Sequence, residues 1–174
     1  MNFKIAHRIL LYGVLLWCIA IVLPPFFSSL HFNQGKFFVN VFFSRICHQI
    51  DSHSLHLFGI QLAVCARCSA IYFSFFIGVI TYKKSSVIPF LQSRNFEFPK
   101  IFLFLVPMVL DVLLNKIGLN IPYANERRII TGILFGFPFS LVLTPVFTQS
   151  LVEMFSKKEK FNPPILILDS YEAK

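Results

Sequence analysis

The chain has 174 residues, of which 56% are hydrophobic and only 14% are charged, and its formal net charge is +8. A soluble domain of this length cannot bury so much apolar surface, so the composition indicates an integral membrane protein. The positive charge does not indicate nucleic-acid binding, because the basic residues are not clustered with aromatic residues in a polar segment large enough to fold as a binding module.

The apolar residues fall into four runs of about 18 residues or more, each long enough to cross a hydrocarbon core of about 30 Å as a helix. These runs cover residues 9–27, 64–82, 101–118 and 129–147. The first run ends at Pro24-Pro25 without a small-residue cleavage site, so we expect a mature helix rather than a signal peptide. The predicted fold class is therefore all-α, a four-helix transmembrane bundle in a single domain over residues 1–148, with a cytoplasmic tail over 149–174.

The orientation follows from the Lys and Arg residues in the connections. With the N-terminus inside, ten of these sixteen residues lie on the cytoplasmic side and six on the other. The positive-inside rule then favours a multi-pass protein of the cell membrane with both termini in the cytoplasm. Val64, at the start of the second run, would lie at the extracytoplasmic end of its helix.

The first outer loop, residues 28–63, is too long for a simple turn. Its stretch Lys36 to Cys47 places aromatic pairs between polar residues and is too short to span, so we expect a helix that lies in the interface or re-enters the membrane shallowly. The following segment ends in Gly59, which predicts a turn. It carries three of the five histidines, namely His48, His53 and His56.

The cysteines of this loop and of the second run offer a metal site. Cys65 and Cys68 have the spacing of two thiolates on one metal ion, and Cys47 with His48 adds a third sulfur and an imidazole. Zinc is the ion that this set suits best. Adjacent residues chelate one ion with difficulty, so His53 or His56 could supply the nitrogen in place of His48. Small cysteines also pack in helix bundles, and we read Cys18, alone in the first run, in that way.

Three charged residues are the candidates for a catalytic or substrate-binding role. Arg67 lies inside the CxxC motif, where a guanidinium favours the thiolate, although an arginine at this depth also suits lipid phosphates. Asp111 is placed about 10 Å below the outer end of the third run, where a carboxylate needs a partner. Arg128, at the mouth of the fourth run, is the expected partner, and this pair could equally be a structural link between helices.

Small residues in the fourth run predict close helix packing. Gly132 and Gly136 have the small-xxx-small spacing, and Asn125 with Glu126 precede the run as capping residues do. No Gly-rich phosphate loop, HExxH pair or Ser/His/Asp arrangement occurs, so a hydrolase has no local support in the sequence.

Together these motifs resemble a known family. CHQ, VCARCSAIY, a later Asp and NERRIITG are similar to the motifs of the prokaryotic integral-membrane family known as domain of unknown function 2085, over about half of the chain. The matching positions are Cys47, His48, Gln49, Cys65, Arg67, Cys68, Tyr72, Asp111, Asn125, Arg128, Thr131 and Gly132. The departures are Asp51, His53, Ala70, Val112 and Asn115. The resemblance implies that the matching residues form one site, but it implies no reaction.

Three functions compete on this evidence, and whether the protein is an enzyme stays open. The first is a metal-binding membrane protein. The second is a quinone-linked thiol-disulfide oxidoreductase that uses Cys65 and Cys68, because the architecture is similar to that of bacterial disulfide-forming membrane enzymes; the short loop over 119–126, however, lacks the second cysteine pair of those enzymes. The third is a small accessory subunit of a membrane complex, with Cys47 bridged to Cys65 or Cys68. The expected partners are the lipid bilayer and a membrane protein or a second copy of the chain.

Overall fold

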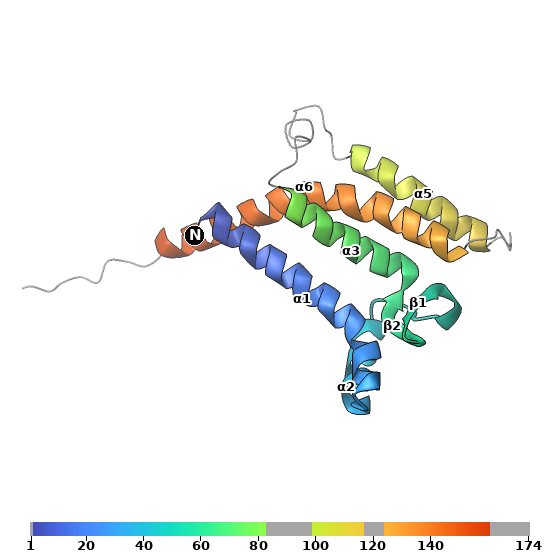
Figure 1. Cartoon of the computed structure of the whole chain (residues 1–174). Coiled ribbons are helices and arrows are strands. Elements are labelled where there is room, and N and C mark those ends of the chain that lie inside the picture. Colours follow the sequence, from blue (N-terminus) through green and yellow to red (C-terminus); the bar gives the residue numbers. More distant parts are fainter. Residues whose placement is uncertain (1, 83–98, 117–123, 161–174) are drawn as a thin grey trace, which may run out of the picture.

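The structure is a computed structural model that describes residues 2–82, 99–116 and 124–160. Four long helices make up most of it and run in alternating directions (Figure 1). They are α1 (Phe3–Ser29), α3 (Ala66–Thr81), α5 (Pro99–Lys116) and α6 (Ala124–Lys160). α1 ends, α3 begins, α5 ends and α6 begins at the same end of the molecule, while the N-terminus lies at the other end.

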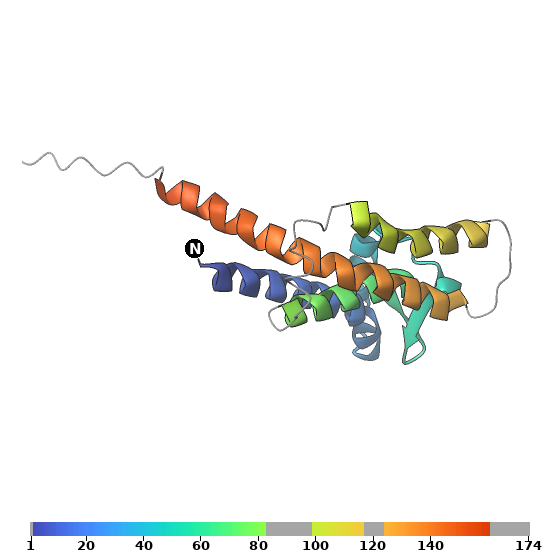
Figure 2. The same ribbon diagram turned by 90° about the horizontal axis from the view of Figure 1, so that it is seen from above.

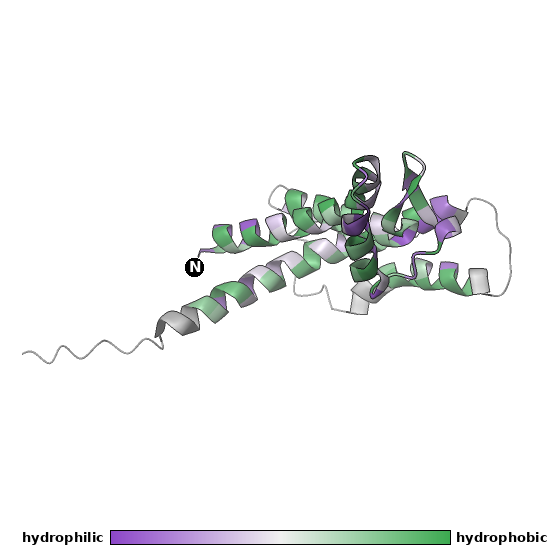
Figure 3. Ribbon diagram, turned by 90° about the horizontal axis from the view of Figure 1, so that it is seen from below, coloured by the Kyte–Doolittle hydropathy of each residue, from purple (hydrophilic) through white to green (hydrophobic). Residues whose placement is uncertain are grey.

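Two of these helices are long and apolar enough to cross a membrane, over Phe3–Ser29 and Asn125–Phe155. Ala66–Thr81 and Phe104–Leu114 are shorter apolar helices. In the described part of the chain each predicted apolar run coincides with a helix, apart from the first two residues of the second run. Figure 3 shows hydrophobic residues along the helices and hydrophilic residues gathered where α6 begins. Length and composition support two of the four predicted crossings, and the four-helix transmembrane bundle stays a prediction.

The structure is mostly helical, as predicted, but the segment between α1 and α3 also contains a β-hairpin, which the all-α prediction lacked. Strands β1 (Ser54–Leu57) and β2 (Ile60–Cys65) pair antiparallel. The turn between them is Phe58-Gly59, with φ of 54° and 73°, the left-handed conformation that two-residue hairpins require. The predicted turn at Gly59 is thus confirmed, whereas the strands on either side of it escaped detection.

The hairpin also changes where the second long helix begins. Val64 and Cys65, expected inside the helix, are the last residues of β2, and α3 begins at Ala66. Leu62, Ala63 and Val64 are all buried in the core against α1 and α2, so the strand reads as one continuous apolar run. Such a run cannot be told from the start of a buried helix by its periodicity.

The remaining elements between α1 and α3 are helix α2 (Asn33–Ser44) and the 3-10 turn η1 (Asp51–His53). The helix predicted over residues 36–47 is therefore present, shifted by three residues toward the N-terminus. α2 runs across the direction of the long helices (Figures 1 and 2) and exposes several phenylalanines, while Phe43 enters the core. Its place at a membrane interface stays a prediction.

α6 packs closely on α3, as the small residues predict. A Cβ on Gly132 would lie 2.8 Å from the Ala70 Cβ, and one on Gly136 would lie 2.5 Å from the Ile71 carbonyl oxygen. The packing role expected for these two glycines is confirmed. α6 also continues to Lys160, beyond the predicted end at 147; the remainder of the predicted tail, from 161 on, lies outside the described residues.

Candidate metal centre

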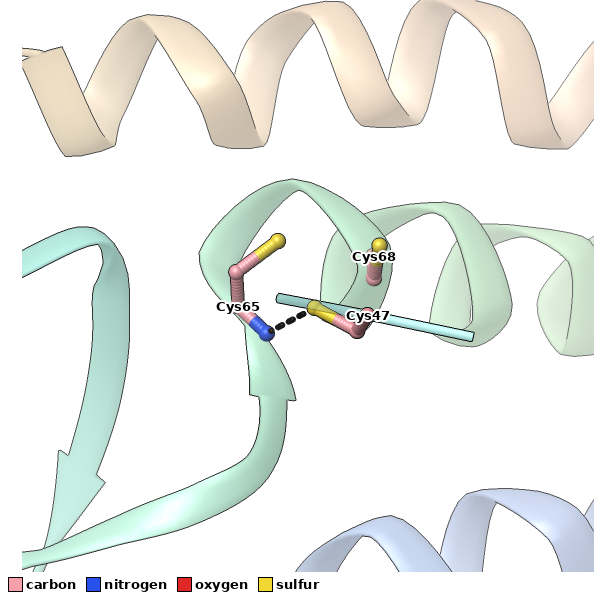
Figure 4. A group of neighbouring side chains, drawn as sticks. All are labelled: Cys47, Cys65 and Cys68. Atoms are coloured by element: carbon pink, nitrogen blue, oxygen red, sulfur yellow. Dashed lines mark hydrogen bonds between the residues drawn. The ribbon is translucent and has the colours of Figure 1, made fainter. Parts of the chain in front are cut away.

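Three cysteines meet where the hairpin runs into α3 (Figure 4). The Sγ atoms of Cys47, Cys65 and Cys68 all lie within 4.8 Å of one another. Cys65 ends β2 and is the N-cap of α3, Cys68 lies in the first turn of that helix, and Cys47 comes from the segment after α2. Two separate parts of the chain therefore bring sulfur to one point. The fourth cysteine, Cys18, is buried in α1 and contacts the Tyr72 carbonyl oxygen, 3.6 Å away, as expected of a packing residue.

The sulfur of Cys47 accepts a hydrogen bond from the backbone. The backbone N–H of Cys65 donates to it over 3.2 Å, and the Cys47 side chain is buried. The thiols of Cys65 and Cys68 lower the pKa of Cys47 by donating hydrogen bonds to its sulfur, and the backbone N–H groups of Cys65 and Gln49 add to this effect. The arrangement favours a thiolate, which is the form that binds a metal ion or attacks a disulfide.

Gln49 fixes the loop that carries Cys47. Its backbone has a φ of 49°, which turns the chain sharply after His48. Its side-chain amide donates to the carbonyl oxygens of Asn40, at 2.9 Å, and Ala63, at 2.7 Å, so it ties α2 to β2. Sequence reasoning matched Gln49 to a motif but missed this role, since a single Gln gives no sign of the backbone groups it will meet.

A cavity of about 240 Å³ lies beside the sulfurs. Its lining includes all three clustered cysteines and also His48, Gln49, His53, Arg67 and Arg128. The ligand atoms that lie within 4.8 Å of one another are the three sulfurs, and in the described residues no histidine nitrogen belongs to that set. His48, predicted as a fourth ligand, thus lies on the cavity wall, where its role as a ligand stays a prediction.

The two alternative histidines differ in position. His56 lies on β1, and its Nε2 contacts the Asp51 carboxylate at 2.9 Å. His53 lines the cavity and is half-buried. Burial lowers the pKa of His53, and the positive charges of Arg128 and Arg67 lower it further. Its imidazole is therefore held in the neutral form, which is the form that binds a metal.

The predicted pairing of Asp111 with Arg128 is not the arrangement found. Asp111 of α5 accepts a hydrogen bond from Arg67 of α3, and its other oxygen lies 3.5 Å from Nη1 of Arg127 on α6. Its carboxylate is 5% exposed. Arg128, and not the adjacent Arg127, was the expected partner; a helix turns adjacent side chains about 100° apart, so the two arginines face different neighbours. The carboxylate links three helices, and the side chain of Asn115, expected beside it, lies outside the described residues.

Arg128 instead faces the cavity and is held by the start of its own helix. Its Nη1 donates to Oδ1 of Asn125 over 2.8 Å. The Asn125 amide in turn lies 3.4 Å from the carbonyl oxygen of Ser52 in η1. Arg67 and Arg128 therefore line the cavity with the sulfurs, whereas Asp111, which contacts Arg67, is not among the lining residues; the roles predicted for these three residues stay predictions.

The chain is similar in sequence to other proteins. The model of a family described as "Predicted membrane protein (DUF2085)" matches residues 47–142, which include the three clustered cysteines and the charged residues around them. The uncharacterized protein MJ1492 of Methanocaldococcus jannaschii is 33% identical over 158 residues, covering 86% of this chain and 97% of the relative. No solved structure matches the chain.

Proposed function

The chain belongs to the DUF2085 family of predicted membrane proteins, and we propose that it binds a soft divalent metal ion, zinc, through Cys47, Cys65 and Cys68. The ion would lie at the end of the molecule that holds the hairpin. The excess of basic residues in the other connections favours an extracytoplasmic position for this end, with both termini in the cytoplasm.

The observation that carries the proposal is the convergence of three sulfurs from two segments of the chain within 4.8 Å. Thiolates bound to one zinc ion at about 2.3 Å lie about 3.8 Å apart on the edges of a tetrahedron. Small side-chain rotations would bring the cysteines to these distances. Packing alone gives no reason for the chain to gather three thiols around a polar cavity.

The fourth coordination position is open to a ligand from the cavity. His48 and His53 line the cavity, and either imidazole would complete a Cys3His site of the structural kind. A water molecule or a substrate atom in this position would make the site catalytic. Three thiolates and one Zn²⁺ carry a net charge of −1, and Arg67 and Arg128 on the cavity wall would stabilise that charge.

Metal analysis of the purified full-length protein tests the proposal. We expect about one zinc ion per chain in the wild type, and less than about a tenth of that in Cys47→Ser and Cys65→Ser. Cys18→Ser is the matched control, because Cys18 is buried away from the cluster and should leave the zinc content unchanged. A wild-type protein with less than about half an ion per chain, or a Cys65→Ser variant with full metal content, would contradict the proposal.

The same cluster supports a second candidate, a quinone-linked thiol oxidoreductase. The observation in its favour is that a third thiol, Cys47, lies beside a CxxC pair at a helix N-terminus, where thiol-disulfide exchange is chemically possible. Two thiols would form a disulfide and pass two electrons and two protons to a quinone, giving a hydroquinone. Differential alkylation and mass spectrometry of native membranes decide the matter: cysteines that stay fully reduced exclude this candidate.

A further inference from the structure

We propose that the cavity beside the cysteine cluster binds a small oxyanion, a phosphate or carboxylate group, which Arg67 and Arg128 hold. The position and burial of the two arginines support an anion site whether or not a metal ion is bound. Only the placement of the oxyanion next to a metal ion rests on the proposed function. Neither the fold nor the similar proteins identify a ligand for this cavity.

Arg128 gives the strongest support for an anion site. This residue is only 6% exposed and lines the cavity, and its guanidinium contacts Asn125, which is uncharged. Within residues 2–82, 99–116 and 124–160, no carboxylate forms an ion pair with Arg128. A buried guanidinium is costly unless anions accompany it. Asp111 and the Cys65 sulfur attract Arg128 electrostatically but form no ion pair with it among the described residues, so the cavity can accept a further anion from outside the chain.

Guanidinium groups gather on one side of the cavity. Among the described residues, Asp111 pairs with both Arg67 and Arg127, and Arg128 adds a third guanidinium group nearby. The Nε of Arg67 is also buried without a hydrogen-bond partner among the described residues.

The cavity suits an oxyanion in size and in the groups that line it. Its volume of about 240 Å³ leaves room for a phosphate or carboxylate with a few attached atoms. Planar guanidinium groups bind such anions through two parallel hydrogen bonds, and the Gln49, His48 and His53 side chains add neutral polar groups. With a metal ion on the three sulfurs, an oxygen of the same anion could occupy the fourth coordination position.

Cobalt-substituted full-length protein in a neutral detergent gives the test. Co²⁺ on thiolates has visible absorption bands, which report metal binding, and a change in these bands on addition of inorganic phosphate or acetate reports an anion beside the metal. We expect a saturable change in the wild type and an affinity weaker by about tenfold or more in Arg128→Gln. Arg128→Lys, which keeps the charge but loses the planar fork, should fall between the two.

Arg45→Gln is the matched control, because Arg45 is an exposed arginine at the end of α2 that does not line the cavity. Its affinity for phosphate should equal that of the wild type. An equal loss in Arg45→Gln and Arg128→Gln would overturn the inference, because it would assign the effect to general surface charge. Cobalt bands that respond to neither anion, free or lipid-borne, would overturn it as well, while leaving the metal proposal intact.

Two further arms separate the possible sources and the two proposals. In lipid nanodiscs, a response to phosphatidic acid that is absent with phosphatidylcholine identifies a lipid headgroup, whereas a response to free phosphate alone identifies a soluble anion; either supports the inference.

Thermal unfolding of the metal-free protein, measured with and without phosphate, separates the oxyanion site from the metal site. If no cobalt bands form, the metal proposal fails, and stabilisation of the metal-free wild type but not of Arg128→Gln still supports the oxyanion site. Without that stabilisation, the inference fails too.

Discussion

The backbone N–H of Cys65 donates a hydrogen bond to the sulfur of Cys47, 3.2 Å away, across a sequence separation of 18 residues. This contact joins the loop after α2 to the junction of β2 and α3. It also explains why a CH pair and a distant CxxC pair belong together, since the hairpin between them returns the chain to its starting point. The hairpin, which the sequence did not reveal, is thus the element that assembles the site.

Gln49→Ala should expose Cys47. The substitution removes the two hydrogen bonds that tie the loop to α2 and β2, so the segment that covers the Cys47 sulfur would open more often. We expect Cys47 to react with a maleimide about tenfold faster or more, as measured by mass spectrometry of metal-free protein. Gln34→Ala, an exposed glutamine of α2, is the control and should leave the rate unchanged. Equal rates in all three proteins would show that Gln49 does not hold the loop.

If the protein binds zinc as proposed, removal of the ion should destabilise it. A ligand that binds only the folded state at a hundredfold excess over its dissociation constant contributes about 2.7 kcal/mol. A chelator should therefore lower the melting temperature of the wild type but not that of Cys68→Ser. The fluorescence of the single tryptophan, Trp17, reports unfolding, because its ring lies 5.2 Å from that of Phe43 in the core. A chelator with no effect on the wild type would argue against a tightly bound ion.

Asp111→Asn should be strongly destabilising. The change leaves Arg67 and Arg127, which are 19% and 24% exposed, without the carboxylate that they share. Loss of one partner of a buried ion pair costs about 3–5 kcal/mol, and we expect a decrease in the free energy of unfolding near the lower end of this range, measured by denaturant titration in detergent micelles. Asp51→Asn, whose carboxylate is 80% exposed beside His56, should change it by less than about 1 kcal/mol. Equal effects of the two substitutions would contradict this account.

Gly136→Ala should force α3 and α6 apart. The new Cβ would lie 2.5 Å from the carbonyl oxygen of Ile71 and 3.0 Å from its Cα, and these backbone atoms cannot move aside independently of the helix. Overpacking of this kind costs about 1–3 kcal/mol, visible as a lower melting temperature. Gly13→Ala is the control, because nothing lies within 4 Å of its added Cβ and alanine favours a helix. A Gly136→Ala variant as stable as Gly13→Ala would show that the helices can adjust.

Much of the architecture could be predicted because apolar length is a strong signal. Each predicted run lies on a helix where the structure describes it, except that Val64 and Cys65 belong to β2, and the glycines of α6 pack as their spacing predicts. The three cysteines and two arginines of the site could also be named, since sulfur and buried charge are rare in an apolar chain. In both cases the residue type itself carried the information.

The remaining features depend on contacts between distant segments. β2 is buried over consecutive residues, so it has no alternating pattern to distinguish it from the helix that follows. The choice of Arg127 over Arg128 as a partner of Asp111 depends on the rotation of α6 against α5, which no local pattern encodes. The role of Gln49 likewise depends on two carbonyl groups that only the folded chain brings near it.

The shared carboxylate of Asp111 has a consequence for biogenesis. α5 carries this acid in the middle of an apolar stretch, and its cationic partners belong to a helix made earlier and a helix made later. In a bilayer, α5 would therefore enter beside Arg67 with its charge balanced, and Arg127 would join when α6 arrives. In a chain truncated before α6, Asp111 would keep one of its two guanidinium partners, Arg67. In a chain without α3, the Asp111 carboxylate would have neither partner in the bilayer until α6 is made.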